Sequence, residues 1–243
     1  MSQAPIGLAL PRLTPAVKVL LVANTALFLL IGLTFQFLPE VGRPLYRNLA
    51  LSVPALMDLK LWTILSYAFV HSLEDVFHLL FNMLLLYFFG PTLERRWGTR
   101  QFMVFYLAGA LGGGAVFAAF NFAIGSDTMV VGASGAVLAL VVAWGILFPQ
   151  MPIYFFGLVP LKGYHLIALT VAIELLTAVS QSPVSSSCHF GGMATGALLV
   201  TGYWKPAKLW ARLKPKKKKR IPKLSVFVNR NHDDKEPPGG WVN

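Results

Sequence analysis

A serine and a histidine, each in an apolar stretch, are the residues of this chain whose types could do covalent chemistry together. Ser134 lies in the run Gly132-Ala133-Ser134-Gly135, and His189 opens a later apolar run. A serine hydroxyl becomes a nucleophile when a neighbouring imidazole takes its proton, which is the arrangement found in serine hydrolases. The pair therefore predicts acyl transfer, provided that the fold brings the two side chains together.

The surroundings of Ser134 permit two interpretations. The residue is predicted to lie in the first turn of a helix, where unpaired backbone N–H groups and the positive end of the helix dipole stabilise an oxyanion. Small residues such as Gly132 and Gly135 are also what close helix packing in a membrane requires, and in isolation the run favours that structural interpretation. The run alone does not decide between them.

His78 and Asn82 form a second polar group in an apolar stretch. They are four residues apart and so share one face of a helix. A hydrogen bond to a neighbouring helix would explain them, and so would a role as side-chain donors to an oxyanion. Because His78 is predicted to lie near the same membrane face as Ser134, the two donors could complete an oxyanion hole with the Ser134 backbone N–H.

The composition indicates that lipid surrounds most of the chain. Hydrophobic residues make up 56% of it and charged residues 13%, whereas a soluble domain has about 25% charged residues. The net charge of +11 comes largely from a tail, since ten of the 21 basic residues lie between Lys205 and Lys223. This distribution argues against a nucleic-acid partner. The single cysteine, Cys188, excludes an intramolecular disulfide.

The apolar segments predict an all-α membrane protein with six transmembrane helices and a large interfacial first loop. Each segment is suited to crossing a hydrocarbon layer of about 30 Å. The predicted spans are Val19–Leu38, Val76–Leu93, Phe102–Ile124, Gly132–Phe148, Tyr164–Val179 and His189–Trp204.

Three regions follow from these spans. Residues 1–15 are predicted to be a cytoplasmic N-terminus, residues 16–204 the six-helix membrane domain, and residues 205–243 a basic, disordered cytoplasmic tail. The basic run of the tail is interpreted as a determinant of topology, and binding of anionic lipid headgroups is compatible with it.

Short loops rich in Lys and Arg stay on the cytoplasmic side of a membrane. The loop after the second span contains Arg95, Arg96 and Arg100, whereas the loops at 125–131 and 180–188 contain no Lys or Arg. Both termini are therefore predicted to be cytoplasmic. With this topology the fourth and sixth spans begin on the same outer side, at Gly132 and His189, so that serine and histidine lie at similar depth.

Close approach of the fourth and sixth spans requires small residues. Gly192 and Gly196 form a small-xxx-small pair just past His189, which is a typical packing surface of membrane helices. The packing pattern thus agrees with the predicted chemistry.

Together these motifs resemble those of the rhomboid intramembrane serine proteases, over all six predicted helices. The family's motifs occur here as His78-Leu-Leu-Phe-Asn82, Gly132-Ala-Ser134-Gly135 and His189-Phe-Gly-Gly192-Met-Ala-Thr-Gly196, in the family's order. The resemblance implies a rhomboid-like bundle and an intramembrane serine endopeptidase.

The resemblance also implies residue roles. Ser134 is the expected nucleophile and His189 its general base and acid, while His78, Asn82 and the Ser134 backbone N–H form the oxyanion hole. Trp62 of the first loop and Glu94-Arg95-Arg96 resemble structural motifs of the family. The chain departs from the family pattern at Thr63, where an arginine is common, and at Leu138, where an aromatic residue often stacks on the histidine. His71 precedes His78 by seven residues, a wider gap than the resemblance leads one to expect.

The proposed acyl transfer needs no cofactor or metal. A zinc mechanism is unsupported because no His-Glu-x-x-His motif occurs, and an intramembrane aspartyl mechanism is unsupported because no aspartate lies in a predicted span. The expected partners are single-pass transmembrane protein substrates and membrane lipids. The expected location is a multi-pass position in a membrane, the bacterial cell (inner) membrane being favoured. The alternative is a catalytically inactive rhomboid-like protein that binds membrane clients.

Glu174 is the one carboxylate well inside a predicted span, and such a residue needs an explanation. It lies about 8 Å from the outer end of the fifth span, within possible reach of His189. A Ser-His-Glu triad is one interpretation. A structural or water-contacting role is favoured here, because the resemblance implies a dyad, and Glu174→Gln is then expected to retain at least about a tenth of the activity.

Overall fold

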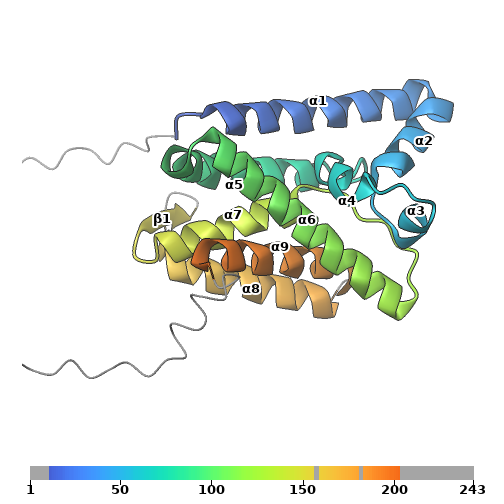
Figure 1. Ribbon diagram of the computed structural model, residues 1–243. Coiled ribbons are helices and arrows are strands. Elements are labelled where there is room, and N and C mark those ends of the chain that lie inside the picture. The colour runs from blue at the N-terminus through green and yellow to red at the C-terminus, as the bar shows by residue number, and fades with distance from the viewer. Residues whose placement is uncertain (1–10, 156–158, 181–182, 203–243) are drawn as a thin grey trace, which may run out of the picture.

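The computed structural model describes residues 11–155, 159–180 and 183–202, which fold mainly into helices (Figure 1). Each of the six predicted spans overlaps a helix in the described residues. These are α1 (Pro15–Phe37), α5 (Val76–Trp97), α6 (Thr99–Ile124), α7 (Ser134–Leu147), α8 (Gly163–Ser180) and α9 (Pro183–Thr201).

Within the described residues, four helices are long and apolar enough to cross a membrane, namely α1, α5, α6 and α8. The apolar α7 has 14 residues, which at 1.5 Å per residue is about 21 Å and shorter than the hydrocarbon layer. The chain is thus a multi-helix protein with several membrane-spanning candidates. The predicted tail, 205–243, lies outside the described residues.

The predicted first loop is largely helical. It contains α2 (Pro39–Leu49), α3 (Val53–Met57), α4 (Thr63–Ser66) and the 3-10 helix η1 (Tyr67–Phe69). Serine at position 52 caps α3, because its hydroxyl accepts a hydrogen bond of 3.2 Å from the backbone N–H of Ala55. The segment before α5 is therefore a folded part of the protein.

An antiparallel hairpin joins α7 to α8. Its strands are β1 (Pro152–Phe155) and β2 (Val159–Lys162), and Pro152 pairs with Lys162. The expectation of an all-α fold missed this hairpin. Each strand has only four residues and one of them is proline, so the sequence shows no alternation from which a strand could be predicted.

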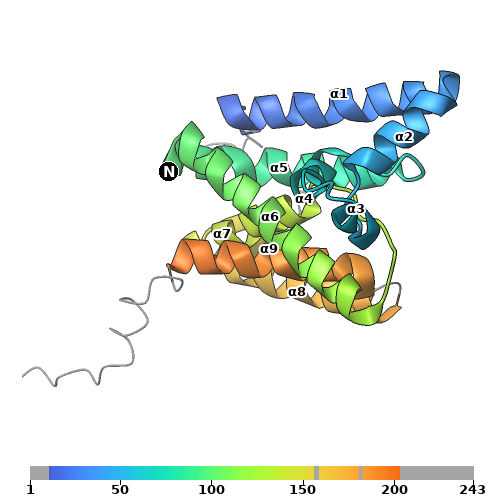
Figure 2. The ribbon, with the colours of Figure 1, turned by 45° about the vertical axis from the view of Figure 1, so that its right-hand side comes forward.

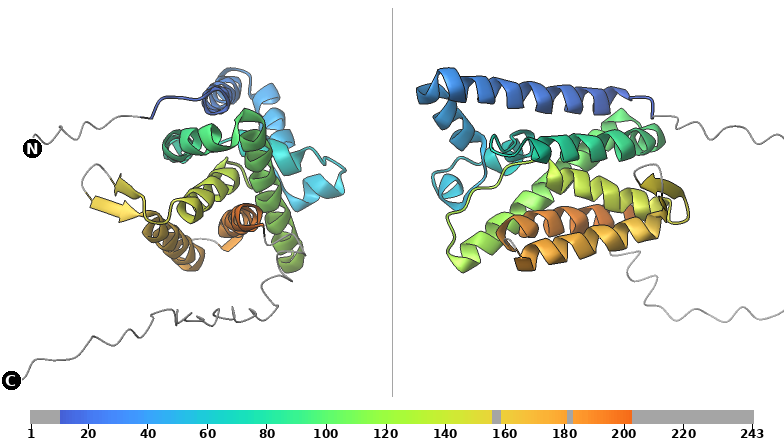
Figure 3. Two further views of the ribbon diagram at one scale, coloured as in Figure 1. Left: turned by 60° about the vertical axis from the view of Figure 1, so that its left-hand side comes forward. Right: turned by 180° about the vertical axis from the view of Figure 1, so that it is seen from behind.

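The centre of the bundle is α7. Every residue from Gly135 to Gly145 is buried, and the helix lies among α5, α6, α8 and α9 when the bundle is seen end-on (Figure 3). A helix that is hydrophobic all round requires such an enclosed position. Helix α6 runs obliquely across α7 and α9 (Figure 2), so the start of α7 is held from several sides.

The outer helices have apolar side chains that no protein atom covers. On α8, Leu176 is 70% exposed and Val179 is 89% exposed. Exposed apolar surface of this kind is costly in water and favourable against lipid. It supports placement of the bundle in a membrane.

A buried carboxylate joins the starts of α1 and α6 to the end of α5. Glu94 accepts hydrogen bonds from the backbone N–H groups of Ala16, at 2.9 Å, and Val17, at 3.1 Å, and also bonds the hydroxyls of Thr14 and Thr99. The first N–H groups of α1 have no partner within their helix, and a negative charge there is favourable. This network agrees with the structural interpretation of Glu94.

Helix α9 begins six residues earlier than predicted. The predicted start is His189, because the polar segment 180–188 is predicted to be a loop, whereas the helix begins at Pro183. Proline is favoured in the first turn of a helix. The hydroxyl of Ser187 donates to the carbonyl oxygen of Val184 at 2.6 Å, so the helix itself satisfies this polar side chain.

Candidate active site

The predicted nucleophile and base lie on two helices whose backbones touch. A Cβ atom added to Gly192 of α9 would lie 2.1 Å from the carbonyl oxygen of Gly135 in α7. One turn further along, a Cβ on Gly196 would lie 2.5 Å from the carbonyl oxygen of Ala139. Only glycine permits this approach, so both glycines of the predicted small-xxx-small pair lie in the α7–α9 contact.

This contact brings Ser134 and His189 to the same level. Gly135, the residue after the serine, lies against Cys188, the residue before the histidine, because its added Cβ would be 3.4 Å from the Cys188 sulfur. Both Ser134 and His189 are half-buried. No hydrogen bond joins the Ser134 hydroxyl to the His189 ring in this structure. In enzymes without substrate such bonds are often long and shorten only when substrate binds.

Gly132 places His78 beside the loop that precedes Ser134. Its backbone has a φ of +122°, a conformation that residues with a side chain rarely adopt. An added Cβ would also lie 2.5 Å from Nε2 of His78. Two independent constraints therefore require glycine at position 132. His78 is also close enough to His189 for their charges to interact, so the three predicted motifs meet in one region.

Asn82 lies on the same helix as His78 but uses one amide N–H locally. Its Nδ2 donates to the carbonyl oxygen of His78 at 2.7 Å. An amide group has two N–H donors, so this bond leaves a second one for a ligand. The side chain is almost fully buried, with 5% of it exposed.

Tyr67, which the sequence analysis did not single out, supports the serine loop from η1. Its carbonyl oxygen accepts a hydrogen bond of 2.9 Å from the backbone N–H of Gly132. Its hydroxyl donates to the carbonyl oxygen of Ala110 in α6 at 2.7 Å and lies 3.4 Å from the Cys188 sulfur. Burial raises the pKa of the Tyr67 hydroxyl well above its usual value, which keeps this donor protonated. The available signal in the sequence was a tyrosine in an apolar part of the first loop, because a tyrosine that becomes buried needs a hydrogen-bond partner.

His71 is a second buried support for the loop. Its Nε2 accepts a long hydrogen bond of 3.4 Å from the backbone N–H of Ala133, and its ring centroid lies 5.4 Å from that of His78. Burial, and then the neighbouring His78, lower the pKa of His71 from 6.5 to about 3. The ring is therefore neutral at physiological pH, which is the state that can accept a hydrogen bond. The wide spacing from His78 in sequence does not prevent the two rings from lying together.

Glu174 of α8 contacts the predicted base. Its Oε2 lies 2.7 Å from Nδ1 of His189, and only 9% of Glu174 is exposed. The position of Glu174 along its helix predicts that the two side chains are within reach of each other. The structure brings them into hydrogen-bond contact.

The two departures from the family pattern are accommodated locally. Leu138 is buried and packs with Val142 and Met193 between α7 and α9, so an aliphatic cluster fills this part of the α7–α9 contact. In the first loop Thr63 is buried and its hydroxyl donates to the carbonyl oxygen of Lys60 at 2.7 Å. The nearby indole N–H of Trp62 donates to the carbonyl oxygen of Asn48 at 2.8 Å, in agreement with a structural role.

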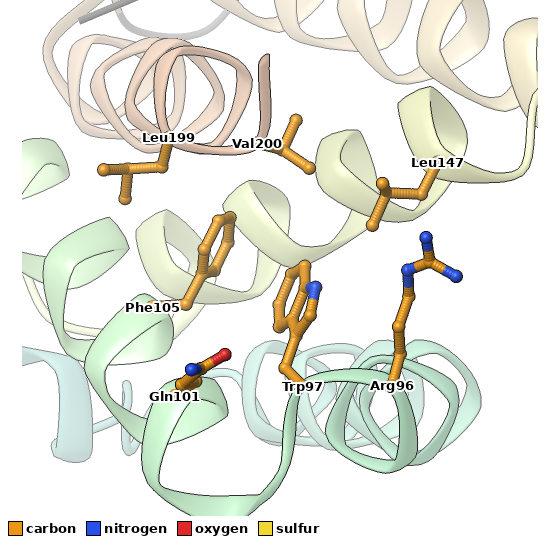
Figure 4. Close-up of a pocket in the computed structure, with 7 residues that line it drawn as sticks. All are labelled: Arg96, Trp97, Gln101, Phe105, Leu147, Leu199 and Val200. Carbon is orange, nitrogen blue, oxygen red and sulfur yellow. The ribbon is translucent and has the colours of Figure 1, made fainter. Parts of the chain in front are cut away.

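A pocket of about 540 Å³ lies away from these residues, at the other end of α7 (Figure 4). Leu147 lines it and is 13 residues beyond Ser134, which corresponds to about 20 Å along the helix. The other lining residues are Arg96, Trp97, Gln101, Phe105, Leu199 and Val200.

The sequence is similar to a family of known proteins. The rhomboid domain family matches residues 58–206. Over 183 residues the chain is 28% identical to RHOMBOID-like protein 12, mitochondrial, of Arabidopsis thaliana, covering 69% of this chain and 51% of that protein. It is 34% identical over 139 residues to RHOMBOID-like protein 2 of the same plant, covering 57% of this chain and 41% of that protein.

A third relative is Rhomboid-like protease 3 of Toxoplasma gondii, with 25% identity over 154 residues, 62% of this chain and 54% of that protein. The chain spans about half the length or less of the relatives named here. The matched domain runs from the first loop through α9 and contains every motif described above. The chain belongs to the rhomboid family.

Proposed function

We propose that this chain is an intramembrane serine endopeptidase that cleaves transmembrane protein substrates within or near the bilayer, using Ser134 and His189. The observation that supports this most directly is the glycine-mediated contact of α7 with α9. It places the residue after the serine against the residue before the histidine. Membership of the rhomboid family is consistent with this activity, because the family includes serine proteases as well as inactive members.

The proposed reaction is acyl transfer. The Ser134 oxygen bonds to the carbonyl carbon of the scissile peptide while His189 takes the hydroxyl proton, and the carbonyl oxygen becomes an oxyanion. The C–N bond then breaks, and the amine leaves with the proton from His189. Water next attacks the acyl ester, giving its proton to His189, and the serine is regenerated with release of the carboxylic acid.

The oxyanion is proposed to bind at the start of α7. The backbone N–H of Ser134 lies at the N-terminus of that helix, where the first N–H groups have no partner within the helix. His78 lies against Gly132 at the same loop, and Asn82 has a second amide N–H for this use. Donors fixed in advance around a developing charge contribute strongly to acyl transfer.

The proposed substrates are single-pass transmembrane proteins, and the proposed surroundings include membrane lipids. Six membrane passages, a first loop at the lipid–water interface and cytoplasmic termini are part of the proposal. The relatives named above are plant and protozoan proteins, one of them mitochondrial by name. They give no support to the bacterial cell membrane that the sequence analysis favoured, so the proposal specifies a membrane without naming the compartment.

The test uses the full chain purified in detergent and a single-pass substrate with small residues at the cleavage site. Ser134→Ala and His189→Ala are each expected to abolish cleavage, and the double variant to be no worse, because the two residues act as a unit. A fluorophosphonate probe should label the wild type and fail to label Ser134→Ala. Substantial cleavage by Ser134→Ala would overturn the proposal. A folded wild type that neither cleaves nor reacts would favour an inactive family member that binds membrane clients.

A further inference from the structure

A buried carboxylate lies against the ring of the proposed base. Glu174 comes from α8 and His189 from α9, and their contact of 2.7 Å joins the two helices. About 11% of the Glu174 side chain and 21% of the His189 side chain are exposed. A carboxylate in an apolar bundle is costly unless it has a hydrogen-bond partner. The histidine ring supplies that partner.

The contact selects one form of the ring. An ionised carboxylate only accepts hydrogen bonds, so the hydrogen must lie on Nδ1 of His189. In the neutral imidazole the lone pair is then on Nε2, the nitrogen that does not bond Glu174. This is the tautomer that a general base needs in order to take a proton from a serine.

Nearby groups do not take the place of Glu174. Leu138, one turn after Ser134, is aliphatic and packs with Val142 and Met193, so it offers no hydrogen-bond acceptor for a histidine. His78 of α5 is close enough to His189 for their charges to interact, and a histidine cannot stabilise a positive charge on a second ring as a carboxylate can. Among the described residues, Glu174 is the carboxylate in contact with the ring, and a carboxylate stabilises the imidazolium that forms during serine attack.

We infer that Glu174 is a positioning residue, which holds His189 in the Nδ1–H tautomer and stabilises its protonated form, so that Ser134, His189 and Glu174 act as a triad. The inference rests on the proposed function. It reverses the preference drawn from the sequence, where a structural role was favoured. It also gives the one carboxylate deep in a predicted span a chemical reason to be there.

The kinetic test compares two substitutions on α8. Glu174→Gln keeps the size of the side chain, but its amide can donate to Nδ1 and favour the unproductive tautomer. We expect kcat to fall by about 10³- to 10⁴-fold with KM little changed. Thr177→Val is the matched control, because it removes a polar group less than one turn away whose hydroxyl bonds its own helix at Ile173. It should cleave like the wild type. Glu174→Asp, which restores the charge, should recover part of the loss.

The second readout is the tautomer of His189, which a purely structural role would not set. The chain has five histidines, and ¹⁵N-histidine NMR spectra of wild type and His189→Ala identify the signals of His189. The wild type should show hydrogen on Nδ1 and a bare Nε2, and Glu174→Gln should lose this signature. Unfolding midpoints of all variants in the same detergent show whether the fold survives.

Two results would overturn the inference. One is Glu174→Gln retaining at least about a tenth of wild-type activity, the outcome expected of a structural residue. The other is an unchanged His189 tautomer in a Glu174→Gln variant whose activity and unfolding midpoint fall together. Failure of the proposed function is recognised separately, because the wild type would then neither cleave nor react with the fluorophosphonate while its His189 tautomer remains measurable.

Discussion

At the scale of single residues, the proposed chemistry depends on side chains that the backbone would hold in place before a substrate binds. Gly132 shows this most directly, because its φ of +122° and its contact with His78 leave no room for a side chain. The loop before Ser134 and the ring of His78 are thus positioned by the same residue. A donor fixed in this way needs no rearrangement when negative charge develops on the substrate.

His78→Ala and Asn82→Ala are therefore expected to lower turnover by about 10²- to 10³-fold for each lost donor, while the protein still folds. The measurement is kcat on the detergent-solubilised enzyme, with the unfolding midpoint as the control for folding. Wild-type turnover in both variants would show that the two residues serve packing alone.

The residue pairs that do the proposed chemistry could be predicted from the sequence, because polar groups in apolar segments are few and each needs a reason. The residues that support the loop before Ser134 could not be predicted from the sequence. Tyr67 and His71 lie in the first loop, where polar and aromatic residues are common, and only the fold shows that they bond Gly132 and Ala133. The contact of Glu174 with His189 could be suspected from depth along the helix, but its distance depends on how α8 packs on α9.

At the scale of helices, the α7–α9 contact is the element on which the site depends. A methyl group on Gly192 would meet a backbone carbonyl of α7 at 2.1 Å, and a backbone atom has little freedom to move aside. The two helices would have to separate, and Ser134 would separate from His189 with them.

We expect Gly192→Ala to destabilise the bundle by about 1–3 kcal/mol, as overpacking of a close-packed contact does, and to lower cleavage strongly. Gly32→Ala is the matched control. That glycine also lies within a helix, but its added Cβ would meet only the side chain of Leu73 at 3.8 Å. The control should be neutral or slightly stabilising, since alanine favours the helix. Unfolding midpoints and cleavage rates in one detergent check both, and equal behaviour of the two variants would contradict the packing argument.

The apolar runs of the sequence predicted the positions of the helices well, but they predicted the first and last residues of the helices less accurately. The predicted and observed ends of α6 coincide at Ile124, whereas α9 extends from 189 back to Pro183. The difference has a physical cause. Polarity marks loops only where the polar groups lack partners, and Ser187 has one in the preceding turn of its own helix.

At the scale of the whole molecule, function is proposed to reside in the bundle and not in the basic tail. Deleting residues from Lys214 onward removes much of the positive charge but none of the residues proposed to act in catalysis. Cleavage in neutral detergent should therefore be unchanged. Loss of activity in a deletion variant whose bundle is folded would mean that the tail takes part in the active structure.

The pocket and the candidate active site lie at opposite ends of α7. The pocket lined by Leu147 and Trp97 lies about 20 Å from Ser134 along α7, at the end that the positive-inside rule assigns to the cytoplasm. In the proposed orientation the chemistry would take place at the opposite membrane face, where water for hydrolysis of the acyl ester is available.

One pair of backbone contacts has a consequence for protein engineering. Leu51 and Val130 exchange hydrogen bonds of 3.1 Å and 2.8 Å, and Tyr67 accepts a bond from Gly132 close by. These backbone hydrogen bonds join the first loop to the segment that leads into Ser134. A chimera that grafts the first loop of another rhomboid onto this bundle would have to bring residues 130–132 with it. The two segments form one structural unit, although Leu51 and Val130 are 79 positions apart in the sequence.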